Sequence, residues 1–253
     1  MHVTTARADF DWNPKRLRET DARFRDRSPA ELLRWALARF APDICLATSF
    51  GPQTIALMHM VADLRRDTKV FYLDTDLLFP QTYALRDELC ERLGVQVTRV
   101  EASLPLHAQE AHYGKELWAR DPQRCCYLRK VLPLQRVLAD KRAWITGVRR
   151  AHTAERAGAR LVEWDAANAL VKINPLVHWT DEQVWEYLRR HDLPSNPLHR
   201  EGYPSIGCRP CTWPVSRGQD PRSGRWAGTE RTECGIHLDH ARTAGGKLRV
   251  IGQ

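Results

Sequence analysis

The fold is decided by residues 43–64, which read DICLATSFGPQTIALMHMVADL. The apolar run 44–47 predicts a short buried strand, residues 49–52 a turn, and the spaced apolar residues of 53–64 an amphipathic helix. In a doubly wound sheet, ligands bind beyond the carboxyl ends of the strands, where a helix N-terminus offers N–H groups and partial positive charge. The turn is therefore a candidate anion site, although by itself it fits an ordinary βα connection equally well.

The same alternation of strand and helix continues along the chain. Strands are expected at 69–76, 95–102 and 143–148, and helices at 79–94, closed by Gly94, and at 128–139. Thr180 is the expected N-cap of a last clear helix at 181–191. This pattern predicts an α/β fold with a mainly parallel sheet and helices on both faces. Residues 1–217 are expected to form the α/β domain, and residues 218–253, rich in glycine and charge, a mobile C-terminal tail.

Composition narrows the class of partner. The chain of 253 residues has a net charge of +8, from 39 Lys and Arg against 31 acidic residues. An anionic partner is indicated, and nucleic acid, nucleotide and sulfate ester all fit. Nucleic acid is the least favoured, because the basic residues are scattered among acidic ones. The N-terminus lacks an apolar core of signal-peptide length and no segment approaches ~18 continuous apolar residues, so we expect a cytoplasmic protein without a membrane partner.

Three strand ends carry residues suited to an anionic nucleotide. Hydroxyl groups and a glycine in the first turn can approach a phosphate or sulfate, and several guanidiniums together can grip a multiply charged anion. A single arginine is more often a solvated surface charge, but the carboxyl ends of parallel strands converge on one rim of a sheet. The candidates are Ser49, Gly51 and Thr54 after the first strand, Asp74 and Thr75 after the second, and Arg149, Arg150 and Arg156 after the strand at 143–148.

Four of the seven cysteines form two close pairs, Cys125 with Cys126 and Cys208 with Cys211. In a reducing compartment they are expected to be metal ligands or catalytic thiols rather than disulfides. The Cys-x-x-Cys spacing alone suits zinc, an iron–sulfur cluster or a redox dithiol. Adjacent cysteines point in divergent directions and more easily serve two irons, which favours a 4Fe-4S cluster over zinc or unliganded thiols. Lys130, four residues after Cys126, would share its helix face and offset the negative charge.

Cys234, in the segment RTECGIHLDH, is a candidate nucleophile. No apolar periodicity surrounds it, and an accessible thiol is nucleophilic as a thiolate. His237 and Arg231 would favour the thiolate, whereas Glu233 would oppose it. An incidental exposed thiol is the competing interpretation. Cys45 and Cys90 lie within an apolar strand and a helix, and we expect them to be small core residues.

Together, the segments SFGPQT, YLDTDLLFPQT, CCYLRKVLPL, GVRR, GCRPC and ECGIH resemble the phosphoadenylyl- and adenylyl-sulfate reductase family, which has the adenine nucleotide α-hydrolase-like fold. The likeness covers about residues 44–237. In that family the four cluster cysteines mark enzymes that reduce adenylyl sulfate, while forms specific for the 3′-phosphorylated substrate generally lack them. The resemblance therefore implies an assimilatory adenylyl-sulfate reductase that uses thioredoxin and carries a 4Fe-4S cluster.

The resemblance also implies roles for individual residues. Cys234 would attack the sulfate sulfur, releasing AMP and leaving an S-sulfocysteine, with His237 and Lys130 as further catalytic residues. Phe50, Leu73, Arg222 and Arg225 would join the candidates named above as substrate-binding residues. The cluster would be held by Cys125, Cys126, Cys208 and Cys211.

Two departures from the family pattern and several alternatives remain. Asp76 stands where the family usually has glycine, and a carboxylate there would weaken anion binding unless it points away or meets an arginine. The turn at Ser49 lacks the acidic residue of ATP-cleaving relatives, which suits an enzyme that needs no magnesium–ATP.

The alternative functions are a reductase for the 3′-phosphorylated substrate or for both substrates, an iron–sulfur tRNA-thiolating ATP pyrophosphatase, and a zinc-stabilised nucleic-acid-binding module. The sequence leaves open glutaredoxin as reductant and the oligomeric state, including a homo-oligomer.

Overall fold

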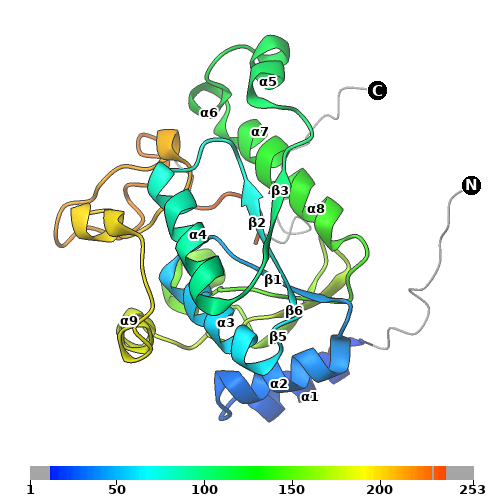
Figure 1. Cartoon of the computed structure of the whole chain (residues 1–253). Coiled ribbons are helices and arrows are strands. Elements are labelled where there is room, and N and C mark those ends of the chain that lie inside the picture. The colour runs from blue at the N-terminus through cyan, green and yellow to red at the C-terminus, as the bar shows by residue number, and fades with distance from the viewer. Residues whose placement is uncertain (1–11, 230, 238–253) are drawn as a thin grey trace, which may run out of the picture.

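The computed structural model describes residues 12–229 and 231–237, and Figure 1 shows a twisted sheet with helices packed around it. The sheet has six strands in the order β3-β2-β1-β4-β6-β5. All neighbouring strands are parallel except β5 and β6, which are antiparallel. The strands are β1 (Ile44–Ala47), β2 (Lys69–Asp74), β3 (Val97–Glu101), β4 (Ala143–Ile145), β5 (Val162–Asp165) and β6 (Leu170–Ile173). The predicted α/β fold with a mainly parallel sheet is confirmed.

Local signals in the sequence set the ends of three helices. α3 (Pro52–Leu64) begins directly after the turn that follows β1, and Pro52 suits its first position because that N–H would have no helical partner. Gly94 closes α4 (Pro80–Leu93) with φ at 61°, in the left-handed region that glycine tolerates. Thr180 begins α9 (Asp181–Arg190) through a capping box. The predicted helices at these three places are confirmed.

Two apolar cores lie on opposite faces of the sheet, because successive residues of a strand point to opposite sides. Leu46 belongs to the core that α2 (Pro29–Phe40), α3 and α9 cover. Its neighbour Cys45 packs on the other face with Phe71, Trp144 and residues of α8 (Leu132–Leu138). α1 (Pro14–Phe24) lies against β5. The core role predicted for Cys45 is confirmed by its complete burial, whereas Cys90 on α4 is only partly buried.

Between β3 and β4 the chain forms α5 (Leu106–Tyr113), α6 (Leu117–Arg120), α7 (Pro122–Cys126), a π-helical turn (Tyr127–Val131) and α8. The helix expected at 128–139 is thus a π turn followed by an α-helix. Pro133 gives a physical reason, because it has no N–H for the carbonyl of Arg129 and its ring would crowd that carbonyl in a regular α-helix. Among the described residues, no helix is both long and apolar enough to cross a membrane.

The topology creates a crevice at β1. From β1 the chain winds outward through β2 and β3, then returns to add β4 on the other side of β1. The carboxyl ends of β1 and β4 therefore flank the point where the winding reverses, and ligands of open α/β sheets bind at such a point. The strand expected at 143–148 ends at Ile145, so residues 146–149 are free to form the wall of this crevice.

Candidate active site

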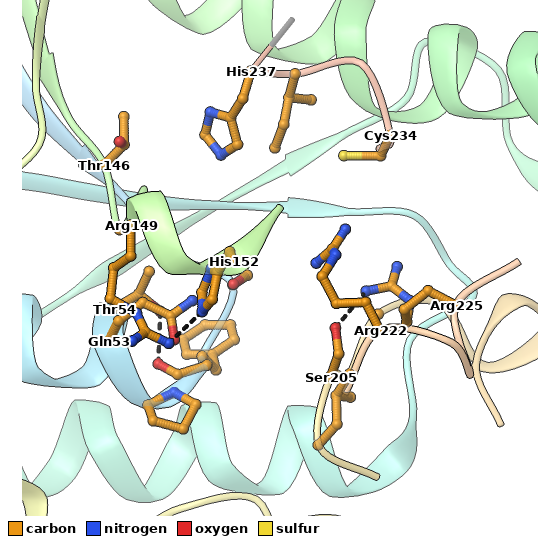
Figure 2. Close-up of a pocket in the computed structure, with 18 of the residues that line it drawn as sticks. Gln53, Thr54, Thr146, Arg149, His152, Ser205, Arg222, Arg225, Cys234 and His237 are labelled. Atoms are coloured by element: carbon orange, nitrogen blue, oxygen red, sulfur yellow. Dashed lines mark hydrogen bonds between the residues drawn. The ribbon is translucent and has the colours of Figure 1, made fainter. Parts of the chain in front are cut away.

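A cavity of about 590 Å³ opens at the carboxyl ends of β1 and β4. Figure 2 shows Cys234 and His237 along one side of it, Gln53, Thr54 and Arg149 on another, and Arg222 and Arg225 beside Ser205. The structure brings twelve of the predicted site residues to this cavity: Ser49, Phe50, Gly51, Thr54, Leu73, Lys130, Arg149, Arg156, Arg222, Arg225, Cys234 and His237.

The turn after β1 is held by hydroxyl groups. Thr48 accepts a hydrogen bond from the Phe50 N–H at 3.1 Å, and its hydroxyl donates to that of Thr54 at 3.2 Å. Thr54 in turn donates to the Gly51 carbonyl at 3.0 Å. Phe50 adopts φ 56°, a left-handed conformation that costs a non-glycine residue energy, and its buried ring packs 5.3 Å from that of Tyr72. These contacts leave Ser49 exposed at the cavity wall.

Gly147, in the wall formed after β4, was not among the predicted residues. A Cβ atom there would lie 2.7 Å from the Thr54 methyl carbon and 2.8 Å from Gln53 Cγ. Only glycine therefore allows this backbone to approach the first turn of α3. At Gly51, by contrast, the nearest atom to an added Cβ is 3.4 Å away and φ is −77°, so no protein contact requires glycine.

Arg149 is a buried cation with protein partners. It donates to the carbonyl of Trp179 at 3.1 Å, to the carboxylate of Asp181 and to Nε2 of His152. Burial, followed by the positive charges of Arg149, Arg156 and Arg222, lowers the pKa of His152 to about 3. His152 is therefore neutral and acts as a hydrogen-bond acceptor for the guanidinium of Arg149.

Three predicted binding residues do not line the cavity. Asp74 is completely buried and accepts hydrogen bonds from Tyr83 at 2.7 Å and from Arg99 at 2.6 Å. Burial raises the pKa of Asp74, but the bonds from Tyr83, the Asp76 N–H and Arg99 outweigh it and leave the pKa lowered. Arg150 is exposed and donates to the Ala159 carbonyl. The third is Thr75, which lies beside the cysteines.

Asp76, whose carboxylate was expected to oppose an anionic ligand, meets two arginines. It adopts φ 56° and forms ion pairs with Arg99 at 3.2 Å and with Arg129. Arg129 is buried and also donates to the Thr75 carbonyl at 2.6 Å. The carboxylate is thus matched by positive charge and is not among the residues that line the cavity, which resolves the conflict raised by the sequence.

Cys125, Cys126, Cys208 and Cys211 line a second, small cavity with Trp118 and Trp226. Burial, reinforced by the neighbouring thiol groups, raises the pKa of Cys125 to about 12 and that of Cys211 to about 11. Burial also raises the pKa of Cys208, but Lys130, a hydrogen bond with Thr75 at 3.2 Å and Arg225 outweigh it and leave that pKa lowered. Within the described residues, no three or more His, Cys, Asp or Glu side chains are arranged to hold a single metal ion.

Lys130 lines both cavities and so joins the cysteines to the larger pocket. Burial would lower the pKa of Lys130, but the sulfur atoms of Cys208, Cys234 and Cys126 outweigh burial and raise it. Lys130 is therefore a cation placed between the cysteines of the small cavity and Cys234 in the larger one. The predicted proximity of Lys130 to Cys126 is present in the structure.

The predicted C-terminal tail is described at 218–229 and 231–237, and these residues pack across the cavity, whereas residues 230 and 238–253 lie outside the described part. Cys234 is partly buried and packs with Cys126 and Trp226. His237 stacks on Trp144 with ring centroids 5.7 Å apart. Burial, followed by the charges of Arg156 and Lys172, holds the pKa of His237 well below its usual range, so its imidazole is neutral.

Two arginines of the 218–229 segment reach the same cavity. Arg222 donates to the Thr232 carbonyl at 2.7 Å. Arg225 is buried, lies 4.5 Å over the ring of Trp226 and donates to Ser205 at 3.3 Å. With Lys130 they give the cavity a positive end next to Cys234, which suits a ligand with more than one anionic group.

Known proteins share both the sequence and the fold. Residues 43–214 match the model of the phosphoadenosine phosphosulfate reductase domain. An adenosine 5′-phosphosulfate reductase of Salinibacter ruber is 52% identical over 227 residues, covering 89% of this chain and 90% of that protein. A phosphoadenosine 5′-phosphosulfate reductase of Gloeobacter violaceus is 45% identical over 215 residues, covering 84% and 89%. The crystal structure of a phosphoadenylyl-sulfate reductase from Candida auris, a phosphate complex, superposes with a TM-score of 0.70 at 26% identity, covering 80% of this chain and 98% of that one.

Proposed function

The chain is an enzyme of the phosphoadenosine phosphosulfate reductase family, and from that premise we propose that it reduces adenylyl sulfate to sulfite and AMP. The observation that carries the proposal is the position of Cys234, at a cavity whose adjoining wall holds Lys130, Arg222 and Arg225. The relative at 52% identity is named for adenosine 5′-phosphosulfate, whereas one at 45% is named for the 3′-phosphorylated nucleotide. Reduction of the 3′-phosphorylated substrate is therefore the second candidate.

The first step is nucleophilic substitution at sulfur. The Cys234 thiolate attacks the sulfate sulfur, an S–S bond forms, and the bond from that sulfur to the bridging oxygen breaks. AMP leaves with the bonding electrons, and the enzyme retains an S-sulfocysteine. Lys130, Arg222 and Arg225 would balance the charge that develops on the leaving phosphate and on the sulfonate. Nδ1 of His237 is buried without a partner among the described residues, which suits a hydrogen bond to a substrate oxygen.

The second step needs a dithiol reductant, for which we propose thioredoxin of the cytoplasm. One thiolate of the dithiol attacks the Cys234 sulfur, sulfite leaves with the electrons of the broken S–S bond, and a mixed disulfide remains. The second thiol of the dithiol resolves that disulfide and restores the Cys234 thiol. The dithiol thus supplies both electrons, and glutaredoxin is an alternative donor of the same kind.

Cys125, Cys126, Cys208 and Cys211 would hold a 4Fe-4S cluster. The donor set fits, because four thiols line one cavity with apolar walls. The pKa values of three of them, Cys125, Cys126 and Cys211, are raised, so a bound cation is needed to keep these thiols ionised. When bound, the cluster would supply structural support and a local negative charge. Lys130 would offset that charge on the side that faces the larger cavity.

The test measures sulfite released from each nucleotide with thioredoxin as reductant. We expect kcat/KM for adenylyl sulfate to exceed that for the 3′-phosphorylated form, and no pyrophosphate from ATP. Comparable values for the two nucleotides would make the enzyme dual-specific, and ATP cleavage without sulfite release would overturn the proposal in favour of an ATP pyrophosphatase. Cys234→Ser should abolish sulfite release, while the control Cys90→Ser, a partly buried cysteine on α4, should retain it.

A further inference from the structure

The segment that carries Cys234 is fixed by a buried ion pair just before the cysteine. The Glu233 carboxylate accepts two hydrogen bonds from Arg156, from Nε at 2.6 Å and from Nη2 at 2.8 Å. The side chains are 3% and 12% exposed, respectively. Thr153 donates a third bond to Glu233 at 3.2 Å. A bidentate Arg–carboxylate pair fixes both distance and orientation, so the backbone next to Cys234 has a defined position.

The neighbouring residue docks on the same loop. The Thr232 hydroxyl donates to Glu155 at 2.6 Å, and Glu155 belongs to the same 3-10 turn as Arg156 (Ala154–Arg156). The loop after β4 therefore receives two consecutive residues of the C-terminal segment. These contacts join residues 77 positions apart in the sequence.

A second contact holds the segment on the other side of the cysteine. Gly235 turns the chain with φ at 94°, Ile236 packs on the core that contains Trp144, and His237 stacks on that tryptophan. Cys234 thus lies between a polar attachment and an apolar one, and both attachments end on residues that line the cavity.

The ion pair with Glu233 also makes Arg156 less available to bind an anionic ligand. Two of its three guanidinium nitrogens, Nε and Nη2, donate to the Glu233 carboxylate, which also balances the positive charge of Arg156. Glu233 further balances Arg222, whose Nη2 is 3.6 Å from the carboxylate. Arg156 is therefore poorly placed to bind the substrate anion, which was the role that its position in the sequence predicted.

We propose that Arg156 is a positioning residue: with Thr153 it forms a docking site for Glu233 that holds the C-terminal segment closed, with the Cys234 thiol directed to the cavity. The role rests on the proposed function of Cys234 as nucleophile. Arg156 acts on the reaction through Glu233 rather than through the substrate. Charge and fork geometry both matter, since a lysine at position 156 could make only one of the two parallel bonds.

The test separates binding from the covalent step in anaerobically prepared enzyme. AMP affinity is measured by calorimetry, and the single-turnover rate of adduct formation on Cys234 by quenched mass spectrometry at saturating adenylyl sulfate. We expect Arg156→Gln and Glu233→Gln each to slow adduct formation by roughly tenfold to a hundredfold while AMP affinity stays unchanged, because misplacing a reacting group by about 1 Å has effects of that size. Arg160→Gln, an exposed arginine just after the loop, is the control and should match the parent enzyme.

Exchanging the two charges distinguishes loss of the ion pair from misfolding of the variants. Arg156→Glu combined with Glu233→Arg should recover at least about tenfold of the rate lost by Glu233→Arg alone, as coupled pairs do in double-mutant cycles. The proposal is overturned if Arg156→Gln weakens AMP binding by roughly tenfold or more while Glu233→Gln does not, since Arg156 would then touch the nucleotide. It is also overturned if the swap recovers nothing. A parent enzyme that forms no adduct on Cys234 would instead remove the proposed function.

Discussion

Replacement of Asp76 tests the electrostatic account of the loop after β2. Arg129 is 1% exposed, and Asp76, 31% exposed, is its carboxylate partner. Without Asp76, Arg129 would keep three neutral acceptors: the carbonyl of Thr75 at 2.6 Å, that of Leu104 at 3.2 Å and Oε1 of Gln109 at 3.1 Å. The substitution therefore leaves a buried cation without its balancing charge.

The magnitude is the sum of two destabilising terms, the loss of the ion pair and the strain of the backbone. Removing one partner of a fully buried ion pair costs about 3–5 kcal/mol, and the partial exposure of Asp76 together with the remaining acceptors reduces this to about 2–3 kcal/mol. The left-handed φ of 56° adds about 1 kcal/mol for alanine and nothing for glycine. We expect Asp76→Ala to cost about 3–4 kcal/mol and Asp76→Gly about 2–3 kcal/mol. Asp76→Asn should cost least, because asparagine tolerates this conformation and its amide oxygen can accept from Arg129.

The assay is thermal unfolding of the anaerobically purified protein, followed by tryptophan fluorescence. At about 2–4 °C per kcal/mol for a chain of this size, the alanine variant should melt roughly 6–16 °C below the parent protein. Asp87→Asn is the control, because Asp87 pairs with Arg86 at the surface and such pairs contribute about 1 kcal/mol or less. Equal melting temperatures for the parent and the alanine variant, or a glycine variant no more stable than the alanine one, would refute the reasoning.

Three further predictions address the positive end of the cavity, the pH dependence of the protein's stability and the four paired cysteines. A Cβ at Gly207 would lie 2.1 Å from Nη2 of Arg225, so Gly207→Ala should displace that guanidinium and lower kcat/KM by roughly tenfold or more, whereas Gly158→Ala, which meets no atom within 4 Å, should not. His152 is neutral in the folded protein with a pKa of about 3 against 6.5 when unfolded, so it destabilises the fold progressively as pH falls from 6.5 toward 3. The free energy of unfolding in urea should fall between pH 7 and pH 5 by about 1–2 kcal/mol less in His152→Gln than in the parent protein. The same fall in both proteins would contradict this. Cys208→Ser should abolish the visible absorption and the iron content of the purified protein, and retention of both would remove Cys208 from the ligand set.

The sequence predicts those parts of the fold that depend on local signals. The strand at 44–47 and the caps at Gly94 and Thr180 are each specified by a few adjacent residues, and the structure has them where they were expected. The capping box of Ser28 and Glu31, which starts α2, is an equally local signal that was available in the sequence and was not used.

The remaining features depend on contacts that no local pattern encodes. β5 and β6 form an antiparallel hairpin whose inner strand carries Lys172, buried because Glu163 pairs with it at 3.0 Å, and this charge hides the apolar pattern of a strand. The packing of 231–237 across the cavity depends on Arg156 and Trp144, which are far away in the sequence. From its content of glycine and charged residues, the segment was predicted only as part of a mobile tail.

In the candidate site, too, the sequence predicts which strand ends meet but not where each side chain points. Residues at strand ends were expected to meet at one rim, because parallel topology brings the carboxyl ends of the strands together, and Ser49, Thr54 and Arg149 from the ends of β1 and β4 do line the cavity. Asp74 and Arg150 also follow strands, yet their side chains turn to Arg99 and to a loop carbonyl. The direction of a side chain at a strand end depends on its partners, which the sequence does not specify.

The most direct test of the account concerns the sulfur of Cys234. The purified enzyme, handled without air and without reductant, is mixed with one equivalent of adenylyl sulfate, and its intact mass and peptide map are recorded. We predict a mass increase equal to one sulfonate group on Cys234, the release of one AMP, and complete removal of the adduct by reduced thioredoxin with formation of sulfite. An enzyme that releases sulfite on every turnover while Cys234 stays unmodified, or that carries the adduct on another cysteine, would contradict the account.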